Sequence, residues 1–180
     1  MATPTTLPAT FVAGDVLTAA QMNNLRGAFR VFQTLTAHKT DTFTTNSTTF
    51  VDLTGLSISI TPQATTSKIL IGYAVQGQGQ AGAVMGSIQI VRGSTAIGNA
   101  DAAGNRTVAN TVLPELGGAV MGQVANFYLD SPATTSATTY KLQIKANTGS
   151  SVYVNRTTTD TDLAAFGRGT SSLIVMEISA

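Results

Sequence analysis

Residues 56–75 read LSISITPQATTSKILIGYAV and decide the fold class. The segment 56–60 alternates strictly between apolar and hydroxyl side chains, which is typical of a β-strand with one buried and one wet face. Pro62 cannot donate a hydrogen bond to a neighbouring strand, so the first strand should stop there. The denser apolar run 68–75 predicts a second strand, in the centre of its sheet.

Strand signals continue on both sides of this segment. Two short turn signals, Asn46-Ser47 and Asn147-Thr-Gly149, each lie between two strand-like runs and predict β-hairpins. The second of these is the clearest hairpin signal in the chain. A last strand ends at the C-terminus and is apolar enough to lie in the interior. The further strands are expected at 40–46, 48–52, 84–91, 96–98, 119–129, 140–145, 151–155 and 172–178.

No helix alternates with these strands, which excludes a βαβ architecture. We predict an all-β protein, an antiparallel β-sandwich with a jelly roll first among the options, preceded by an extended arm and one short N-terminal helix. The chain then divides into three parts. Residues 1–17 form an attachment arm, residues 18–37 a helix for oligomerisation, and residues 38–180 the β-sandwich head.

The arm is expected to be extended and to bind a partner. Pro4 and Pro8 fix the backbone locally and bias the residues before them toward extended geometry. Leu7, Phe11 and Val12 are too few apolar side chains to pack on one another. We therefore expect the arm to attach the protein to a partner, either a neighbouring copy or another protein, with Pro4, Leu7, Pro8 and Phe11 in the contact.

The helix prediction rests on a capping signal and an apolar seam. Thr18 and Gln21 have the spacing of a capping box. Apolar residues then follow at steps of three and four, as in a coiled coil. The seam could pack against sister chains or onto its own β-body. We favour sister chains, because a helix tied to an extended arm is poorly placed to fold back. The seam residues are Met22, Leu25, Phe29 and Phe32.

Composition narrows the class of function. The chain has ten Lys and Arg, nine Asp and Glu, and a net charge of +1, with the basic residues scattered singly. A nucleic-acid partner would need them clustered. Cysteine is absent, which leaves oligomerisation as the expected source of robustness. The N-terminus lacks signal-peptide features, and no apolar run approaches the roughly 20 residues that span a bilayer. We expect synthesis in a cytoplasm and no membrane insertion.

Residues for catalysis are sparse. His38 is the single histidine, and Glu115 and Glu177 are isolated in the sequence. Asp160-Thr-Asp162 is the nearest approach to a cation site, but it lacks the further oxygen ligands of a calcium loop, and turn-forming aspartates are the simpler interpretation. We therefore expect a non-enzymatic protein without catalytic residues, cofactor or essential metal; whether the Asp160/Asp162 loop binds an ion stays open.

Several stretches resemble proteins of tailed bacteriophages. Residues 11–26, FVAGDVLTAAQMNNLR, resemble N-terminal segments of tail-fibre and minor tail proteins. The stretches 128–132, 136–143, 152–156 and 167–177 look like a β-rich head domain common in phage fibre and decoration proteins. The resemblance implies a virion component, trimeric, with a jelly roll like that of tumour necrosis factor or complement C1q.

Together these observations predict a short trimeric tail fibre or spike. The arm would attach it to other virion proteins, and the head would bind a host-surface glycan or protein. The alternative is a trimeric capsid decoration protein that stabilises the shell as a cement. A polysaccharide depolymerase is a third class, and the sparse carboxylates and small body argue against it. The number of copies per particle separates the first two.

Overall fold

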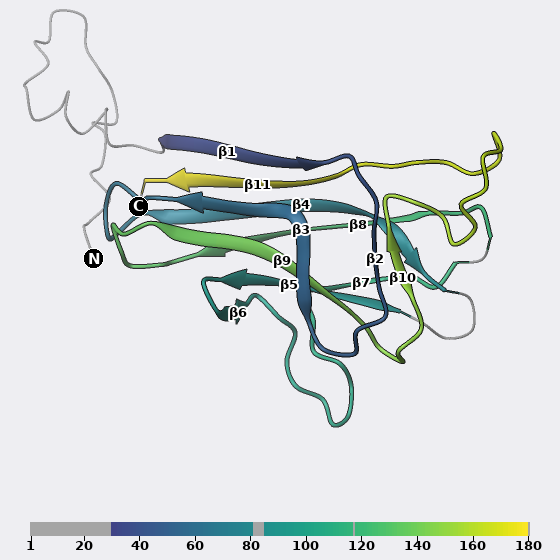
Figure 1. The fold of residues 1–180 in the computed structure, drawn as a ribbon. Helices are drawn as coiled ribbons and strands as arrows, with labels where there is room; N and C mark the ends of the chain where they lie inside the picture. The colour runs from purple at the N-terminus through teal and green to yellow at the C-terminus, as the bar shows by residue number, and fades with distance from the viewer. Residues whose placement is uncertain (1–29, 81–84, 117, 180) are drawn as a thin grey trace, which may run out of the picture.

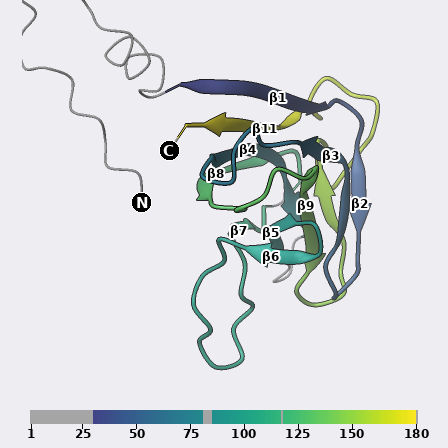
Figure 2. The same ribbon diagram turned by 90° about the vertical axis from the view of Figure 1, so that its left-hand side faces the viewer.

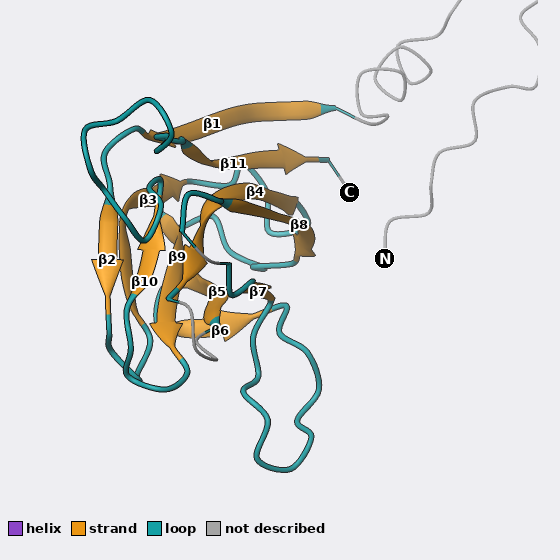
Figure 3. Cartoon of the chain, turned by 90° about the vertical axis from the view of Figure 1, so that its right-hand side faces the viewer, coloured by secondary structure: helices purple, strands orange, loops and turns teal. Residues whose placement is uncertain are grey.

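The computed structural model describes residues 30–80, 85–116 and 118–179. Within these residues the protein is all-β, as predicted, and contains no helix (Figures 1 and 3). No described segment is therefore a helix that could cross a membrane. The strands are β1 (Val31–Lys39), β2 (Phe43–Thr45), β3 (Val51–Ile60), β4 (Lys68–Gly79), β5 (Gly86–Arg92), β6 (Thr95–Ile97), β7 (Thr111–Leu113), β8 (Gly122–Asp130), β9 (Thr138–Ala146), β10 (Val152–Val154) and β11 (Ser171–Ile178).

The first sheet is organised around β4, its longest strand. One edge of β4 pairs with β8. Gly77 of β4 pairs with Gly122 of β8 and also with Val154 of β10, so β10 lies on the edge of β4 opposite to β8. On that same edge β11 pairs with residues 68–74 of β4. β1 extends the sheet beyond β11, and β2 extends it beyond β10. The sheet curls, so that β2 and β10 run across the direction of β1 and β11 (Figure 1).

The second sheet contains β3, β9 and β5 in that order. β6 and β7 both pair with β5, each over three residues. Ile88 pairs with Ile144 of β9 and with Thr111 of β7, so β7 lies on the edge of β5 away from β9. All pairs between named strands in both sheets are antiparallel.

At both predicted hairpins the chain passes from one sheet to the other, so the two strands of each predicted hairpin do not pair with each other. β2 pairs with β10 in the first sheet, whereas β3 pairs with β9 in the second. Likewise β9 and β10, on either side of the Asn147-Thr-Gly149 turn, belong to different sheets. Each turn lies at the surface and carries the chain from one sheet to the other, so that the strands before and after it bury their inner faces against one core.

The core lies between the inner faces of the two sheets. Ile69, Ile71 and Val75 of β4 are fully buried, as are Leu142 and Ile144 of β9. These residues alternate along their strands, which places them on one face of each sheet. The rest of the core cluster consists of Leu53, Leu56, Ile58, Ile60, Tyr73, Ile88, Ile90, Leu113, Tyr140, Ala146, Val152, Val154, Leu173 and Val175.

The predicted helix over residues 18–37 is wrong in its C-terminal part, because residues 31–39 form β1. This strand pairs with β11 from Gln33 opposite Glu177 to Lys39 opposite Ser171. The three-four spacing extended the helix prediction into this segment. Two causes override it: β-branched Val31, Thr34 and Thr36 favour strands, and the ladder to β11 cannot be seen locally. Residues 18–29 lie outside the described residues.

An ion pair between a half-buried arginine and a buried aspartate joins the two sheets near one end of the core. Arg92 of β5 donates from Nη1 to both carboxylate oxygens of Asp130 in β8, at 2.8 and 3.0 Å. The Tyr140 hydroxyl of β9 donates to Asp130 Oδ2 at 2.6 Å. Burial raises the pKa of Tyr140, and the neighbouring carboxylate raises it further, so the hydroxyl stays protonated as a donor.

A second polar cluster joins β4 and β8 to β7. The Tyr73 hydroxyl contacts Asn110 Oδ1 and lies 2.8 Å from Thr111 Oγ1. Asn126 of β8 donates to the same Asn110 oxygen at 3.1 Å, and Asn110 donates in turn to the Gly98 carbonyl. Burial raises the pKa of Tyr73 to about 12, so this hydroxyl also remains neutral. The connection between β6 and β7, which this cluster holds at its base, extends away from the body (Figure 2).

The two ends of the described chain meet at one end of the head. Arg30 and Ser179 exchange hydrogen bonds at 2.9 Å, just before β1 and just after β11. β1 then runs to Lys39, whose carbonyl accepts a hydrogen bond from Asn155. The loop 156–170 therefore lies at the opposite end of the head from the point where the chain enters it (Figure 1).

Candidate functional site

The outer face of the first sheet is apolar. Directly paired residues of antiparallel strands point to the same side of the sheet. One row across the sheet contains Phe127, Gly72 and Ile174, and the next contains Leu129, Leu70 and Met176. Val31 pairs with Ile178 in a third row. We call the following set the apolar face: Val31, Leu70, Phe127, Leu129, Ile174, Met176 and Ile178.

The apolar face is exposed to a degree that is unusual for such side chains. Phe127 is 69% exposed, Val31 55% and Leu129 53%. The outward side chains of β11, from Ile174 to Ile178, are half-buried. Single apolar residues on a surface need no explanation, but a contiguous patch over four neighbouring strands marks an interaction surface.

A glycine positions the most exposed side chain of this face. A Cβ atom at Gly72 would lie 2.6 Å from Cε1 of Phe127 and 3.1 Å from Cγ2 of Ile174. The Phe127 ring therefore lies across the β4 backbone at Gly72, toward β11. The missing side chain leaves room for the ring above Gly72, and the apolar face becomes continuous between β8 and β11.

Polar groups border the apolar face. At one end, the Gln76 side-chain amide lies 3.5 Å from Gln123 Oε1. At the other end, Lys68 donates to Ser131 Oγ at 2.7 Å. Along β1, Thr34 and Thr36 are exposed opposite β11. An apolar centre with a polar rim is the composition of a protein–protein interface.

Most predicted oligomerisation and attachment residues lie outside the described part of the chain. This holds for Met22, Leu25 and Phe29 of the seam and for the arm residues Pro4, Leu7, Pro8 and Phe11. Phe32 is described and lies in β1, half-buried, where the pairing register shifts between Val31 and Gln33. It is therefore part of a strand and does not continue a helical seam.

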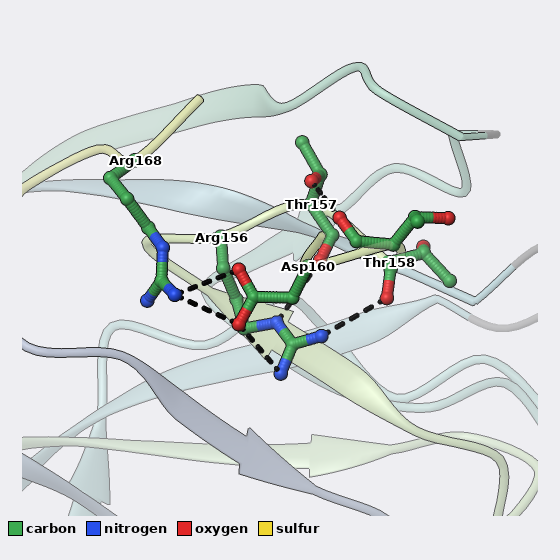
Figure 4. Close-up of polar contacts among 6 residues, drawn as sticks. Arg156, Thr157, Thr158, Asp160 and Arg168 are labelled. Atoms are coloured by element: carbon green, nitrogen blue, oxygen red, sulfur yellow. Dashed lines mark hydrogen bonds and ion pairs between the residues drawn. The ribbon is translucent and has the colours of Figure 1, made fainter. Parts of the chain in front are cut away.

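A cluster of charges stiffens the loop 156–170 (Figure 4). Arg168 contacts both carboxylate oxygens of Asp160, at 2.8 and 2.9 Å, and Arg156 Nη1 lies 3.5 Å from Asp160 Oδ2. The Arg156 guanidinium also donates to the carbonyls of Thr157 and Thr158, at 3.1 Å each. Its Cζ lies 4.9 Å from the centre of the Tyr153 ring. These contacts fix the base of the loop to β10.

Asp160 is therefore occupied by two guanidinium groups. Asp162, the other member of the predicted pair, is exposed. Among the described residues no group of three or more His, Asp or Glu side chains is arranged to hold a metal ion. The contacts of Asp160 favour the interpretation of this segment as a structural loop over that of a cation site.

Asn155 anchors this loop where β4 changes partner from β11 to β10. Its side-chain amide donates to the carbonyls of Lys39 and Asp41, at 3.0 and 2.9 Å. Its backbone amide donates to the Gln76 carbonyl at 2.9 Å. Its Oδ1 accepts from Ser171 Oγ at 2.6 Å. Asn155 has a φ of 60°, a left-handed conformation that asparagine tolerates better than most residues.

Sequence reasoning missed the apolar face. Residues 173–176 of β11 are apolar at both inward and outward positions, and such a run predicts a strand in the interior of the protein. The signal that could have identified the face lies in β8, where Phe127 and Leu129 alternate with inward Tyr128. Two exposed apolar rows become one face only when the pairing of β8, β4 and β11 is known.

No known protein family and no curated protein matches this chain.

Proposed function

We propose that this chain is a structural, non-enzymatic protein of a tailed-bacteriophage virion, a short trimeric tail fibre or spike. Residues 1–17 attach it to other virion proteins, and the β-head faces outward to bind the host surface. The observation that carries the proposal is that the head has two distinct ends. The chain enters at the Arg30–Ser179 end, while the braced loop 156–170 lies at the opposite end. An N-terminal tether would thus present that loop outward.

We further infer that the two sheets form a sandwich of the jelly-roll type. The strands longer than three residues alternate between the sheets along the chain: β3, β5 and β9 belong to one, and β1, β4, β8 and β11 to the other. A jelly roll wraps the chain in this way, as two Greek keys around one core. The fold class agrees with the head that the phage resemblance implies, and it supports the proposal without identifying a receptor.

The first test asks whether the chain is in the particle and in how many copies. Quantitative mass spectrometry of purified virions should find it at a small fixed number set by the symmetry of the tail. A copy number comparable to that of the major capsid protein would replace the fibre by the decoration protein. Its absence from the particles would refute both.

The second test addresses the arm. Replacing Leu7 and Phe11 together by serine should strongly reduce incorporation into particles, because two of the three large apolar side chains of the arm are lost. The melting temperature of the head should not change. The matched control replaces Thr5 and Thr10 by serine, which preserves the polarity of the arm and should leave incorporation intact. Equal incorporation of the two double variants would contradict the attachment role.

A further inference from the structure

We propose that the apolar face is the contact surface between copies of this chain, with three heads placing it toward a shared axis. This inference rests on the proposed trimer and names its interface. It assigns head assembly to outward residues of β1, β4, β8 and β11. The helical seam was the only oligomerisation element that the sequence indicated.

The chemistry of the face favours a second copy as its occupant. All its members are apolar, and the described cations beside it, Lys68 opposite Ile178 and Arg30 before Val31, both stand at one end of the face. Contact between two such faces would bury no charge, so no desolvation of an ion opposes it. The net charge of +1 also leaves little repulsion between copies. A strongly charged partner would find no complementary group on this face.

The size of the face indicates that it does not act alone. Four strands about 4.8 Å apart, with about eight residues rising roughly 3.3 Å each, give an outer face of about 500 Å². A stable two-body interface buries about 800 Å² on each partner. A closed ring of three divides the same face between two neighbours, so in this proposal the seam before β1 has to supply the remaining contact.

The position of the N-terminal end of the head agrees with this arrangement. Val31 belongs to the apolar face and directly follows Arg30, where the chain enters. Three heads with this face inward would bring their preceding residues together at one end of the axis. Met22, Leu25 and Phe29 would then come from three chains that already lie side by side. Sister copies can thus use the seam and the face together.

The experiment measures the mass of the full-length protein by sedimentation at micromolar concentration. Leu129→Glu places a charge on the apolar face from the edge strand β8, and Val31→Glu does so independently from β1. Both should reduce the sedimenting mass from three chains to one. The matched control is Ser59→Glu, an exposed outward position on β3 in the other sheet, which should remain trimeric. Circular dichroism of each variant reports whether the strands are retained.

The outcomes separate this inference from the proposed function. A trimeric wild type with folded, monomeric Leu129→Glu and Val31→Glu variants supports the interface. A trimeric wild type whose two face variants stay trimeric overturns it, while attachment to the virion stands on its own tests. A monomeric wild type overturns the interface and, with it, the trimer of the proposed function.

Discussion

The two sheets of this head have outer faces of opposite character. The outer face of the first sheet is the apolar face. On the outer face of the second sheet, Lys141 Nζ lies 2.7 Å from Asp52 Oδ2. Gln143 donates to Asp52 Oδ1 at 2.8 Å, and Gln89 donates to Gln143 at the same distance. Exposed Ser59 continues this polar surface on β3.

The comparison separates residues that fold the head from residues that we propose to assemble it. Both sheets supply the same kind of inward side chain, and those residues bury the core. The second sheet shows that a polar outer face is compatible with this fold. The exposed Phe127 and Leu129 are therefore not required by folding, which is why we assign them to contact between copies.

The largest expected effect on stability comes from breaking the ion pair between Arg92 and Asp130, which joins the two sheets. Asp130→Asn removes the charge that Arg92 and Tyr140 contact, and leaves the Arg92 cation partly buried without its partner. We expect the free energy of unfolding to fall by about 3 kcal/mol, at the low end for a broken buried pair because Arg92 is 32% exposed. Urea unfolding at one fixed protein concentration measures it.

The matched control for this prediction is Asp52→Asn on the polar outer face. Asp52 also pairs with a cation, but its side chain is 53% exposed, so the expected loss is below about 1 kcal/mol. Similar losses for Asp52→Asn and Asp130→Asn would show that the interior pair does not join the sheets.

A smaller effect is expected at acidic pH, from Glu177 on the inner side of β11. Burial by itself raises the pKa of this carboxyl, but hydrogen bonds from donors that include Gln33 and the Gln63 amide, both at 2.6 Å, lower it below its ordinary 4.5. Because the folded-state pKa is lowered, the carboxylate stabilises the head fully above about pH 4.5. This stabilisation is lost as the pH falls through the folded-state value.

Unfolding midpoints in urea between neutral and acidic pH measure this effect. Glu177→Gln keeps the size and one acceptor oxygen of the side chain but does not titrate. Its stability should be lower at neutral pH and should fall less steeply on acidification than that of the wild type. Parallel curves for the two proteins would show that Glu177 does not cause the acid sensitivity.

The smallest effect is expected from Gly72→Ala, which sharpens the comparison within the apolar face itself. The new methyl group would displace the Phe127 ring, which is exposed and can rotate away, so we expect a stability loss of only about 1 kcal/mol. Sedimentation should show a weaker trimer. In a double-mutant cycle, Gly72→Ala should cost nothing further once Phe127 is alanine. If the losses of stability from Gly72→Ala and Phe127→Ala were additive, Gly72 would not act through the position of the Phe127 ring.

The strands were largely predictable, because their signal is local. Alternation at 56–60 and the apolar run 68–75 became β3 and β4, and Pro62 follows the end of β3. The helix over 18–37 failed at residues 31–37 because spacing alone cannot weigh the ladder that β11 offers. The seam and arm residues before Arg30 stay predictions.

The sequence by itself determined that the described part of this chain is all-β, since an alternation of period two depends only on neighbouring residues. Only the tertiary structure decided that the turns at Asn46-Ser47 and Asn147-Thr-Gly149 cross between sheets. It also decided that Phe127, Leu70 and Ile174 share one outer face. Both facts depend on which strands pair, and pairing is set by burying the core between residues far apart in the chain.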